Sequence, residues 1–218
     1  MQPDPGAYGR VRALTGPADL GAPLTLHLVR HASTALTGSV PSGGDRHGPA
    51  LSDQGVAEAL DLASRLGPAD ALITSPLLRT WQTAWAVREA VGCEPEVAPE
   101  WAELRLGEWD GLGYGEIARR WPQEFARWRE SAAARPPGGE SLSDLQERTD
   151  EAGSRLRARF AGRSVVVVTH TGPVRAVVAG ALAAGPAAYW RLRVDPASVT
   201  TLRYWADGGV EVVTVNRT

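Results

Sequence analysis

Short apolar runs alternate with helix-spaced apolar positions along most of the chain. Apolar runs at residues 24–30, 69–74 and 164–168 predict β-strands, and the unbroken valines of the last run are typical of a strand buried on both faces. A further short strand is expected near residues 94–98. Apolar residues at helical spacing predict helices at about 52–66, 76–91, 141–161 and 172–184. Two further β-branched runs flank Asp207-Gly208-Gly209, and this pattern predicts a closing hairpin.

Capping residues support the starts of these helices. Ser52 is expected to be the N-cap of the first helix, because its hydroxyl can accept a hydrogen bond from a free backbone N–H. Ser75-Pro76 is expected to start the second helix, with proline at the first helical position. Ser141 and Asp144 show the spacing of a capping box at the start of the longest helix.

The order of these elements predicts an α/β fold made of one domain at residues 24–218. Strands that alternate with helices favour a three-layer α/β/α arrangement with a mostly parallel sheet and an antiparallel edge. A less regular stretch at 99–137 is expected to hold shorter helices at 114–120 and 123–130. Residues 1–23 are rich in proline and glycine without sustained periodicity, so we expect a loosely ordered extension there.

Composition excludes several functional classes. The chain has 218 residues and a formal net charge of −2, which gives no electrostatic case for nucleic acid or an anionic membrane as a partner. All 23 basic residues are arginine, so neither a P-loop lysine nor a Schiff-base lysine is available. Cys93 is the single cysteine, which rules out a disulfide framework and a cysteine-based zinc site.

The location, cofactor and partner expectations follow from the same counts. No stretch approaches the length of a membrane span and the N-terminus lacks a cationic region followed by an apolar one, so a cytoplasmic protein is expected. The four histidines show no zinc-binding spacing, so we expect no metal and no other cofactor. A homodimer is kept as an alternative to a monomer.

Cationic and imidazole side chains follow three of the predicted strands. Arg30 and His31 end the first strand, Ser75 and Arg79 follow the second, and His170 follows the valine strand. Ligands of open α/β sheets bind beyond the carboxyl ends of the strands, so these side chains are expected to meet at one edge. Two of the segments also continue into helices whose free N–H groups favour an anion. The residues therefore predict a phosphate site.

Six segments, in this order, resemble the histidine phosphatase superfamily, whose fold is the phosphoglycerate-mutase-like fold. They are residues 28–34 (Leu-Val-Arg-His-Ala-Ser-Thr), 51–55 (Leu-Ser-Asp-Gln-Gly), 74–84, 103–111, 138–141 (Gly-Gly-Glu-Ser) and 168–170 (Val-Thr-His). Each motif alone is weak, but six in register are specific, and together they span about residues 24–182.

The resemblance implies a role for each matching residue. His31 is implied as the nucleophile that forms a phosphohistidine, and Arg30, Arg79 and His170 as the groups that bind the transferring phosphoryl group. Glu103 is implied as the acid that protonates the leaving oxygen and then the base that activates water. Two bidentate arginines and an imidazolium can supply the charge neutralisation that phosphoryl transfer needs without a metal.

The chain departs from the family pattern at three positions near the site. Ala32 replaces the common glycine after the nucleophile. Thr171 replaces the usual glycine after His170, so its backbone is expected to avoid positive φ. Thr37 stands where many members have an asparagine that contacts the phosphate, and its hydroxyl can donate one hydrogen bond. Thr37 and Thr171 are therefore included among the expected phosphate- or substrate-binding residues.

These residues favour a phosphatase that hydrolyses a small phosphorylated metabolite, of the kind found in small branches such as the α-ribazole-phosphate phosphatases. A cofactor-dependent phosphoglycerate mutase is the runner-up, although the chain lacks the long insert that such mutases carry. A phosphate-binding protein without turnover is a third hypothesis. Glu100 and Glu108 lie close to Glu103 in the sequence and are alternatives for the acid.

Substrate choice is expected to depend on the loops at 37–50 and 100–137, because loop residues at the mouth of a site often bind substrate. Arg46 and His47 in the first loop fit a substrate contact and a solvated loop equally well.

Overall fold

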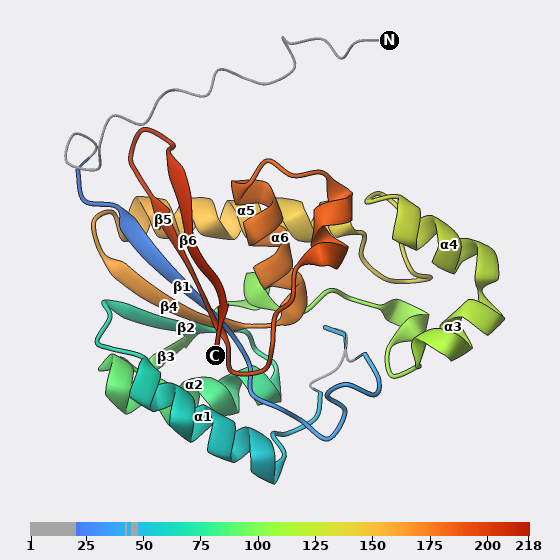
Figure 1. The fold of residues 1–218 in the computed structure, drawn as a ribbon, viewed down its shortest axis with the longest axis horizontal. Helices are drawn as coiled ribbons and strands as arrows, with labels where there is room; N and C mark the ends of the chain where they lie inside the picture. Colours follow the sequence, from blue (N-terminus) through green and yellow to red (C-terminus); the bar gives the residue numbers. More distant parts are fainter. Residues whose placement is uncertain (1–20, 42, 45–47) are drawn as a thin grey trace.

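A mixed sheet forms the centre of the computed structural model, which describes residues 21–41, 43–44 and 48–218. The strands lie in the order β3-β2-β4-β1-β5-β6 (Figure 1). Their bounds are β1 Leu24–Arg30, β2 Ala71–Thr74, β3 Pro95–Val97, β4 Ser164–Thr169, β5 Val199–Tyr204 and β6 Val210–Arg217. Strands β3, β2, β4 and β1 are parallel, and the β5–β6 hairpin adds the antiparallel edge.

Helices cover both faces of this sheet, as the alternation of elements predicts. Helices α1 (Asp53–Arg65) and α2 (Leu78–Val91) pack on one face, and α5 (Leu142–Arg159) and α6 (Thr171–Ala181) pack on the other (Figure 1). Alternate valines of β4 enter the two cores, with Val165 and Val167 on the α5–α6 side. The protein therefore has the predicted three-layer α/β/α fold.

A third apolar cluster lies beyond the helical layers. It is built around helices α3 (Tyr114–Arg120) and α4 (Pro122–Glu130) with the short 3-10 segments η4 (Gly107–Trp109) and η5 (Pro186–Arg191), whereas η3 (Pro99–Trp101) follows β3 (Figure 1). Trp109 is fully buried, and its ring meets the ring of Trp128 edge to face with centroids 5.5 Å apart. This packing places a wall of aromatic residues next to the carboxyl ends of the strands.

The predicted N-caps are confirmed at two helices. Ser52 Oγ accepts a hydrogen bond from the Gly55 N–H at the start of α1. The capping box at α5 is complete, since Ser141 Oγ accepts from the Asp144 N–H and the Asp144 carboxylate accepts from the Ser141 N–H.

The predicted start of the second helix is wrong by two residues. Helix α2 begins at Leu78, and Pro76 lies before it in an extended turn. The Ser75 N–H donates to the carbonyl of Val168, which keeps Ser75 paired with β4 and delays the first helical turn. Helix α5 ends at Arg159, two residues before the predicted end near 161. Helix α6 runs from Thr171 to Ala181, so it begins one residue before the predicted start and ends three residues before the predicted end near 184. The expectation for residues 1–23 falls almost wholly outside the described residues.

Candidate active site

A pocket of about 440 Å³ opens at the carboxyl ends of β1 and β4. All the predicted site residues except His170 line it, namely Arg30, His31, Thr37, Arg79, Glu103 and Thr171. His170 is fully buried behind the pocket wall, and its ring meets the ring of His31 edge to face with centroids 5.2 Å apart. The chain therefore brings together the side chains that follow three separate strands. Arg46 and His47 lie outside the described residues.

Two hydrogen bonds fix the protonation state of His31. Its Nδ1 lies 2.7 Å from the carbonyl oxygen of Ala32, which can only accept, so Nδ1 carries the proton. Its Nε2 lies 3.2 Å from Nε of Arg79, which can only donate, so Nε2 keeps its lone pair. Burial, followed by the charges of Arg79 and Arg30, holds the pKa of His31 well below its usual value. His31 thus presents a neutral imidazole with an unprotonated Nε2.

His170 is held by Ser75, which lies between β2 and α2. Its Nε2 lies 2.8 Å from Ser75 Oγ, and its buried Nδ1 has no hydrogen-bond partner among the described residues. Burial, followed by the nearby charge of Arg79, lowers the pKa of His170 well below its usual value. A phosphate dianion beside this ring would act in the opposite direction and favour the imidazolium.

The two expected phosphate-binding arginines are anchored by backbone carbonyls. Arg30 Nη1 donates to the carbonyl of Val194 at 2.6 Å, and its buried Nε has no partner among the described residues. Arg79 is 1% exposed, and its Nη2 donates to the carbonyl of Gly43 at 3.3 Å. Burial lowers the pKa of both guanidinium groups, and the Glu103 carboxylate partly offsets this effect. Arginine stays charged under such conditions, so the pocket wall carries two fixed cations.

The carboxyl group of Glu103 lies against the N-terminus of α6. Its Oε1 accepts hydrogen bonds from the backbone N–H groups of Leu104 at 2.8 Å and Gly172 at 3.0 Å. The free N–H group of Gly172 in the first turn of α6 therefore donates to the Glu103 carboxyl group, as expected of a helix N-terminus. Of the three neighbouring glutamates, Glu103 lines the pocket, whereas Glu100 forms an ion pair with Arg155.

The two threonines occupy the pocket wall in different ways. Thr37 Oγ1 accepts from the Thr34 N–H at 2.9 Å, so this hydroxyl also shapes the loop after β1. Thr171 is the first residue of α6, with His170 as its N-cap. Its φ is not in the left-handed region, which among the described non-glycine residues holds Ala183, Ala197 and Asn216. The expectation of a non-positive φ at Thr171 is confirmed.

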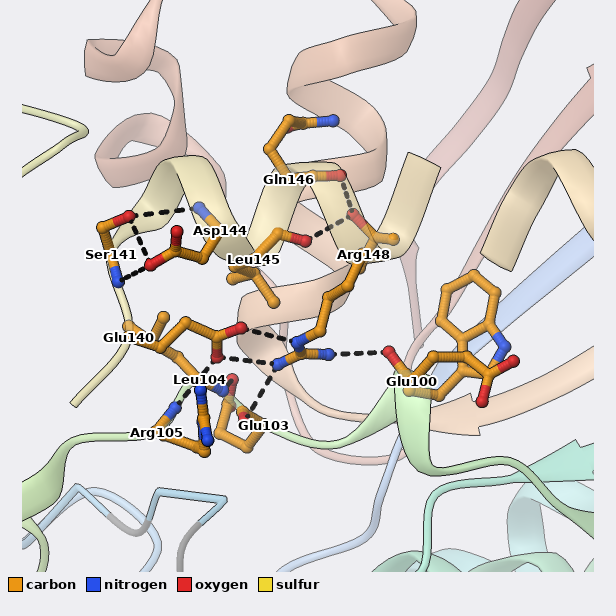
Figure 2. Close-up of polar contacts among 12 residues, drawn as sticks. Glu100, Glu103, Leu104, Arg105, Glu140, Ser141, Asp144, Leu145, Gln146 and Arg148 are labelled. Atoms are coloured by element: carbon orange, nitrogen blue, oxygen red, sulfur yellow. Dashed lines mark hydrogen bonds and ion pairs between the residues drawn. The ribbon is translucent and has the colours of Figure 1, made fainter. Parts of the chain in front are cut away.

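A buried ion pair that the sequence did not reveal supports the Glu103 segment (Figure 2). Arg148 Nε and Nη2 donate to the two carboxylate oxygens of Glu140 at 2.7 and 3.0 Å, and Glu140 is 2% exposed. The same guanidinium donates to the backbone carbonyls of Glu100 at 2.6 Å and Glu103 at 3.2 Å (Figure 2). Helix α5 thereby holds the backbone of Glu103 from behind the pocket.

Other lining residues were missed because only the tertiary structure brings them to the pocket. Arg175 of α6 and the aromatic side chains of Tyr114, Tyr189 and Trp190 also line the pocket. Burial, with a smaller effect of Glu103, raises the pKa of Tyr189, so its hydroxyl stays protonated. The spacing of Arg175, one helical turn after Thr171, is the one sequence signal that could have pointed to it.

The described residues contain neither a candidate metal site nor a candidate membrane-spanning helix. No group of three or more His, Cys, Asp or Glu side chains is arranged there to hold a metal ion. No helix in the same part of the chain is both long and apolar enough to cross a bilayer.

The strand order and the paired imidazoles define a phosphoglycerate-mutase-like α/β protein. Residues 26–218 match the sequence profile of the histidine phosphatase superfamily (branch 1). The chain belongs to this superfamily.

Characterised members and solved structures are similar over most of the chain. The bifunctional protein Rv2228c of Mycobacterium tuberculosis is 33% identical over 99% of this chain and 60% of its own length. Phosphoserine phosphatase 1 of Hydrogenobacter thermophilus is 32% identical over 71% of this chain and 74% of its own. The structure of mycobacterial glucosyl-3-phosphoglycerate phosphatase Rv2419c has a TM-score of 0.80 at 28% identity, covering 90% and 100% of the two chains. The chain thus spans about 60% of the first relative's length.

Proposed function

We propose that this protein is a metal-independent phosphatase that hydrolyses a small phosphomonoester through a phosphohistidine on His31. The observation that carries the proposal is the tautomer of His31, whose Nε2 keeps its lone pair and faces Arg79 at the pocket. A neutral imidazole is the form that can attack phosphorus. Relatives described as phosphatases support the same class of reaction.

The first step is phosphoryl transfer to the enzyme. His31 Nε2 attacks phosphorus, the N–P bond forms and the P–O ester bond breaks, and Glu103 gives its proton to the leaving oxygen. Arg30 and Arg79 neutralise the charge on the phosphoryl oxygens, and His170 donates to them as the imidazolium that the dianion favours. Arg79 Nε, which bonds Nε2 in the free site, is then available to a phosphoryl oxygen.

The second step is hydrolysis of the phosphohistidine. The Glu103 carboxylate takes a proton from water, the water oxygen attacks phosphorus, and the N–P bond breaks to return the lone pair to His31 Nε2. Inorganic phosphate leaves, and Glu103 is again protonated for the next turnover. The two arginines supply the charge neutralisation that a metal ion provides in other phosphatases.

Chemical quenching tests this mechanism. We expect wild-type protein incubated with 32P-labelled phosphomonoester to carry an acid-labile, base-stable label, and His31→Ala to carry none and to lose hydrolysis of p-nitrophenyl phosphate. His27→Ala is the matched control, because His27 lies on β1, the strand that ends directly before His31, and bonds Thr201 outside the pocket lining. EDTA is expected to leave the rate unchanged.

The fate of the label separates the alternative functions. Fast loss to water supports a phosphatase. Transfer to 3-phosphoglycerate without phosphate release would identify a mutase, and absence of any label in the wild-type protein would identify a binding protein. Unchanged turnover in His31→Ala would overturn the assigned nucleophile.

A further inference from the structure

Arg175 is a third arginine in the pocket wall, and the two-step reaction above does not use it. It lies on α6, one helical turn after Thr171, and lines the same pocket as His31 and Glu103. Its side chain is half-buried, so its charge is partly removed from water.

Two contacts hold the Arg175 guanidinium in place. Nε donates to the backbone carbonyl of Leu192 at 2.8 Å, and the guanidinium carbon lies 5.4 Å from the centre of the Tyr189 ring. With Nε engaged, the remaining donors are on the two terminal nitrogens, which form the end of the fork. The group is therefore positioned before any ligand arrives, which reduces the entropy lost on binding.

The charge of Arg175 has no ion-pair partner among the described residues. Arg148 pairs with Glu140 and Arg193 pairs with Asp195, whereas no described carboxylate lies within 4.0 Å of Arg175. Its charge instead opposes that of Arg30, and this repulsion is one cause of the lowered pKa of Arg30. A fixed, half-buried cation beside a second cation favours the binding of an anionic group there.

We propose that Arg175 binds a second anionic group of the substrate, so that the preferred substrates are phosphomonoesters that also carry a carboxylate. This inference rests on the proposed phosphatase function. The proposed reaction already assigns Arg30, Arg79 and the two imidazoles to the transferring phosphoryl group, and a pocket of about 440 Å³ has room for a molecule larger than inorganic phosphate. The end of the Arg175 fork matches the geometry of a carboxylate.

The competing explanation is that Arg175 only ties α6 to the carbonyl of Leu192. A purely structural role would affect acidic and neutral substrates equally. Loss of an anion contact would affect the acidic substrate selectively.

Matched substrate pairs distinguish these explanations. Phosphate release is measured from 3-phosphoglycerate against glycerol 3-phosphate, and from phosphoserine against phosphoethanolamine, in which the carboxylate is replaced or removed. We expect the wild-type protein to favour an acidic member, and Arg175→Gln to lower kcat/KM for that substrate by about tenfold to a hundredfold, mainly through KM. The ratio of acidic to neutral kcat/KM should fall by the same factor.

Arg193→Gln is the control variant. It makes the same chemical change at a side chain that is 82% exposed, pairs with Asp195 and is not part of the pocket lining, so the ratio should stay at the wild-type value. An equal loss for both members of a pair in Arg175→Gln, an unchanged ratio, or no wild-type preference for either acid would overturn the inference. Hydrolysis of p-nitrophenyl phosphate by the wild-type protein would in those cases still support the proposed function. If the wild-type protein neither hydrolyses p-nitrophenyl phosphate nor carries the His31 label, both the inference on Arg175 and the proposed function are overturned.

Discussion

Oε1 of Glu103 lies 3.0 Å from the backbone nitrogen of Gly172, and Oε2 lies 3.2 Å from the same nitrogen. This approach depends on glycine, because a Cβ at residue 172 would overlap Glu103 Oε1. The contact joins the proposed acid to the helix that follows His170, and it sets the distance between the acid and the phosphate-binding groups.

Gly172→Ala is expected to lower kcat by about a hundredfold while changing KM less, because the added methyl group displaces the Glu103 carboxylate by about the distance that costs such a factor. Steady-state kinetics with a phosphomonoester measure this effect. Gly115→Ala is the matched control, since Gly115 lies in α3 and nothing lies within 4 Å of a Cβ added there. Wild-type kcat in Gly172→Ala would show that Glu103 is not held through this contact.

The main features of the fold could be predicted from local patterns. The valines of β4 alternate between two cores, and the capping residues Ser52 and Ser141 act as their sequence positions suggest. The start of α2 at Leu78 could not be predicted, because it depends on the bond from Ser75 to the neighbouring strand β4. Helix propensity depends on neighbouring residues in the sequence, so it does not predict this contact with a distant strand.

The candidate site likewise contains residues that the sequence predicts and residues that only the tertiary structure reveals. Arg30 ends β1, and His31 and His170 directly follow β1 and β4, so the topology of a parallel sheet is enough to bring these residues together. Arg148 and Arg175 lie within helices and reach the site only through the packing of α5 and α6. Their positions in the sequence resemble those of ordinary helical arginines, and only tertiary contacts distinguish them.

Arg148→Met is expected to lower the free energy of unfolding by about 3 kcal/mol, because it leaves the Glu140 carboxylate buried without its partner. It also removes the hydrogen bonds to the carbonyls of Glu100 and Glu103, so kcat should fall as well. Urea unfolding and steady-state kinetics measure the two effects. Arg155→Met, which breaks an exposed pair with Glu100, should cost less than about 1 kcal/mol and leave kcat unchanged.

Arg148→Lys separates the effect of the hydrogen bonds made by the guanidinium from the effect of its positive charge. Lysine keeps the positive charge opposite Glu140 but cannot reach the carboxylate and two carbonyls at once. We expect a smaller loss of stability than in Arg148→Met, together with a comparable loss of kcat. A full recovery of kcat in the lysine variant would show that charge, and not the hydrogen bonds to the Glu103 segment, is what matters.

Gly55→Ala is expected to destabilise the protein by about 1–3 kcal/mol, because a Cβ there would overlap the backbone carbonyl of Ser33 in the loop that follows His31. Urea unfolding measures the change. Gly67→Ala is the control, since nothing lies within 4 Å of a Cβ at that residue and its φ is not left-handed. Equal stabilities of the two variants would contradict the close packing of α1 against this loop.

The two buried histidines also make stability depend on pH. Burial and neighbouring arginines hold the pKa values of His31 and His170 well below 6.5, whereas the unfolded chain takes up a proton at each near pH 6.5. The unfolded state therefore binds more protons than the folded state below that pH. The free energy of unfolding is highest above pH 6.5 and falls as the pH decreases toward the folded-state pKa values.

His170→Gln is expected to weaken this pH dependence. At pH 5.5 each buried histidine lowers the free energy of unfolding by about 1.4 kcal/mol relative to pH 7.5, so removing one should shrink the difference between the two pH values by about that amount. Urea unfolding in phosphate-free buffer measures it, and carboxylates that titrate alike in both proteins cancel. His27→Gln should shrink the difference less, because the pKa of His27 is lowered less far. An unchanged pH dependence in His170→Gln would mean that the folded protein protonates His170 as readily as the unfolded chain does.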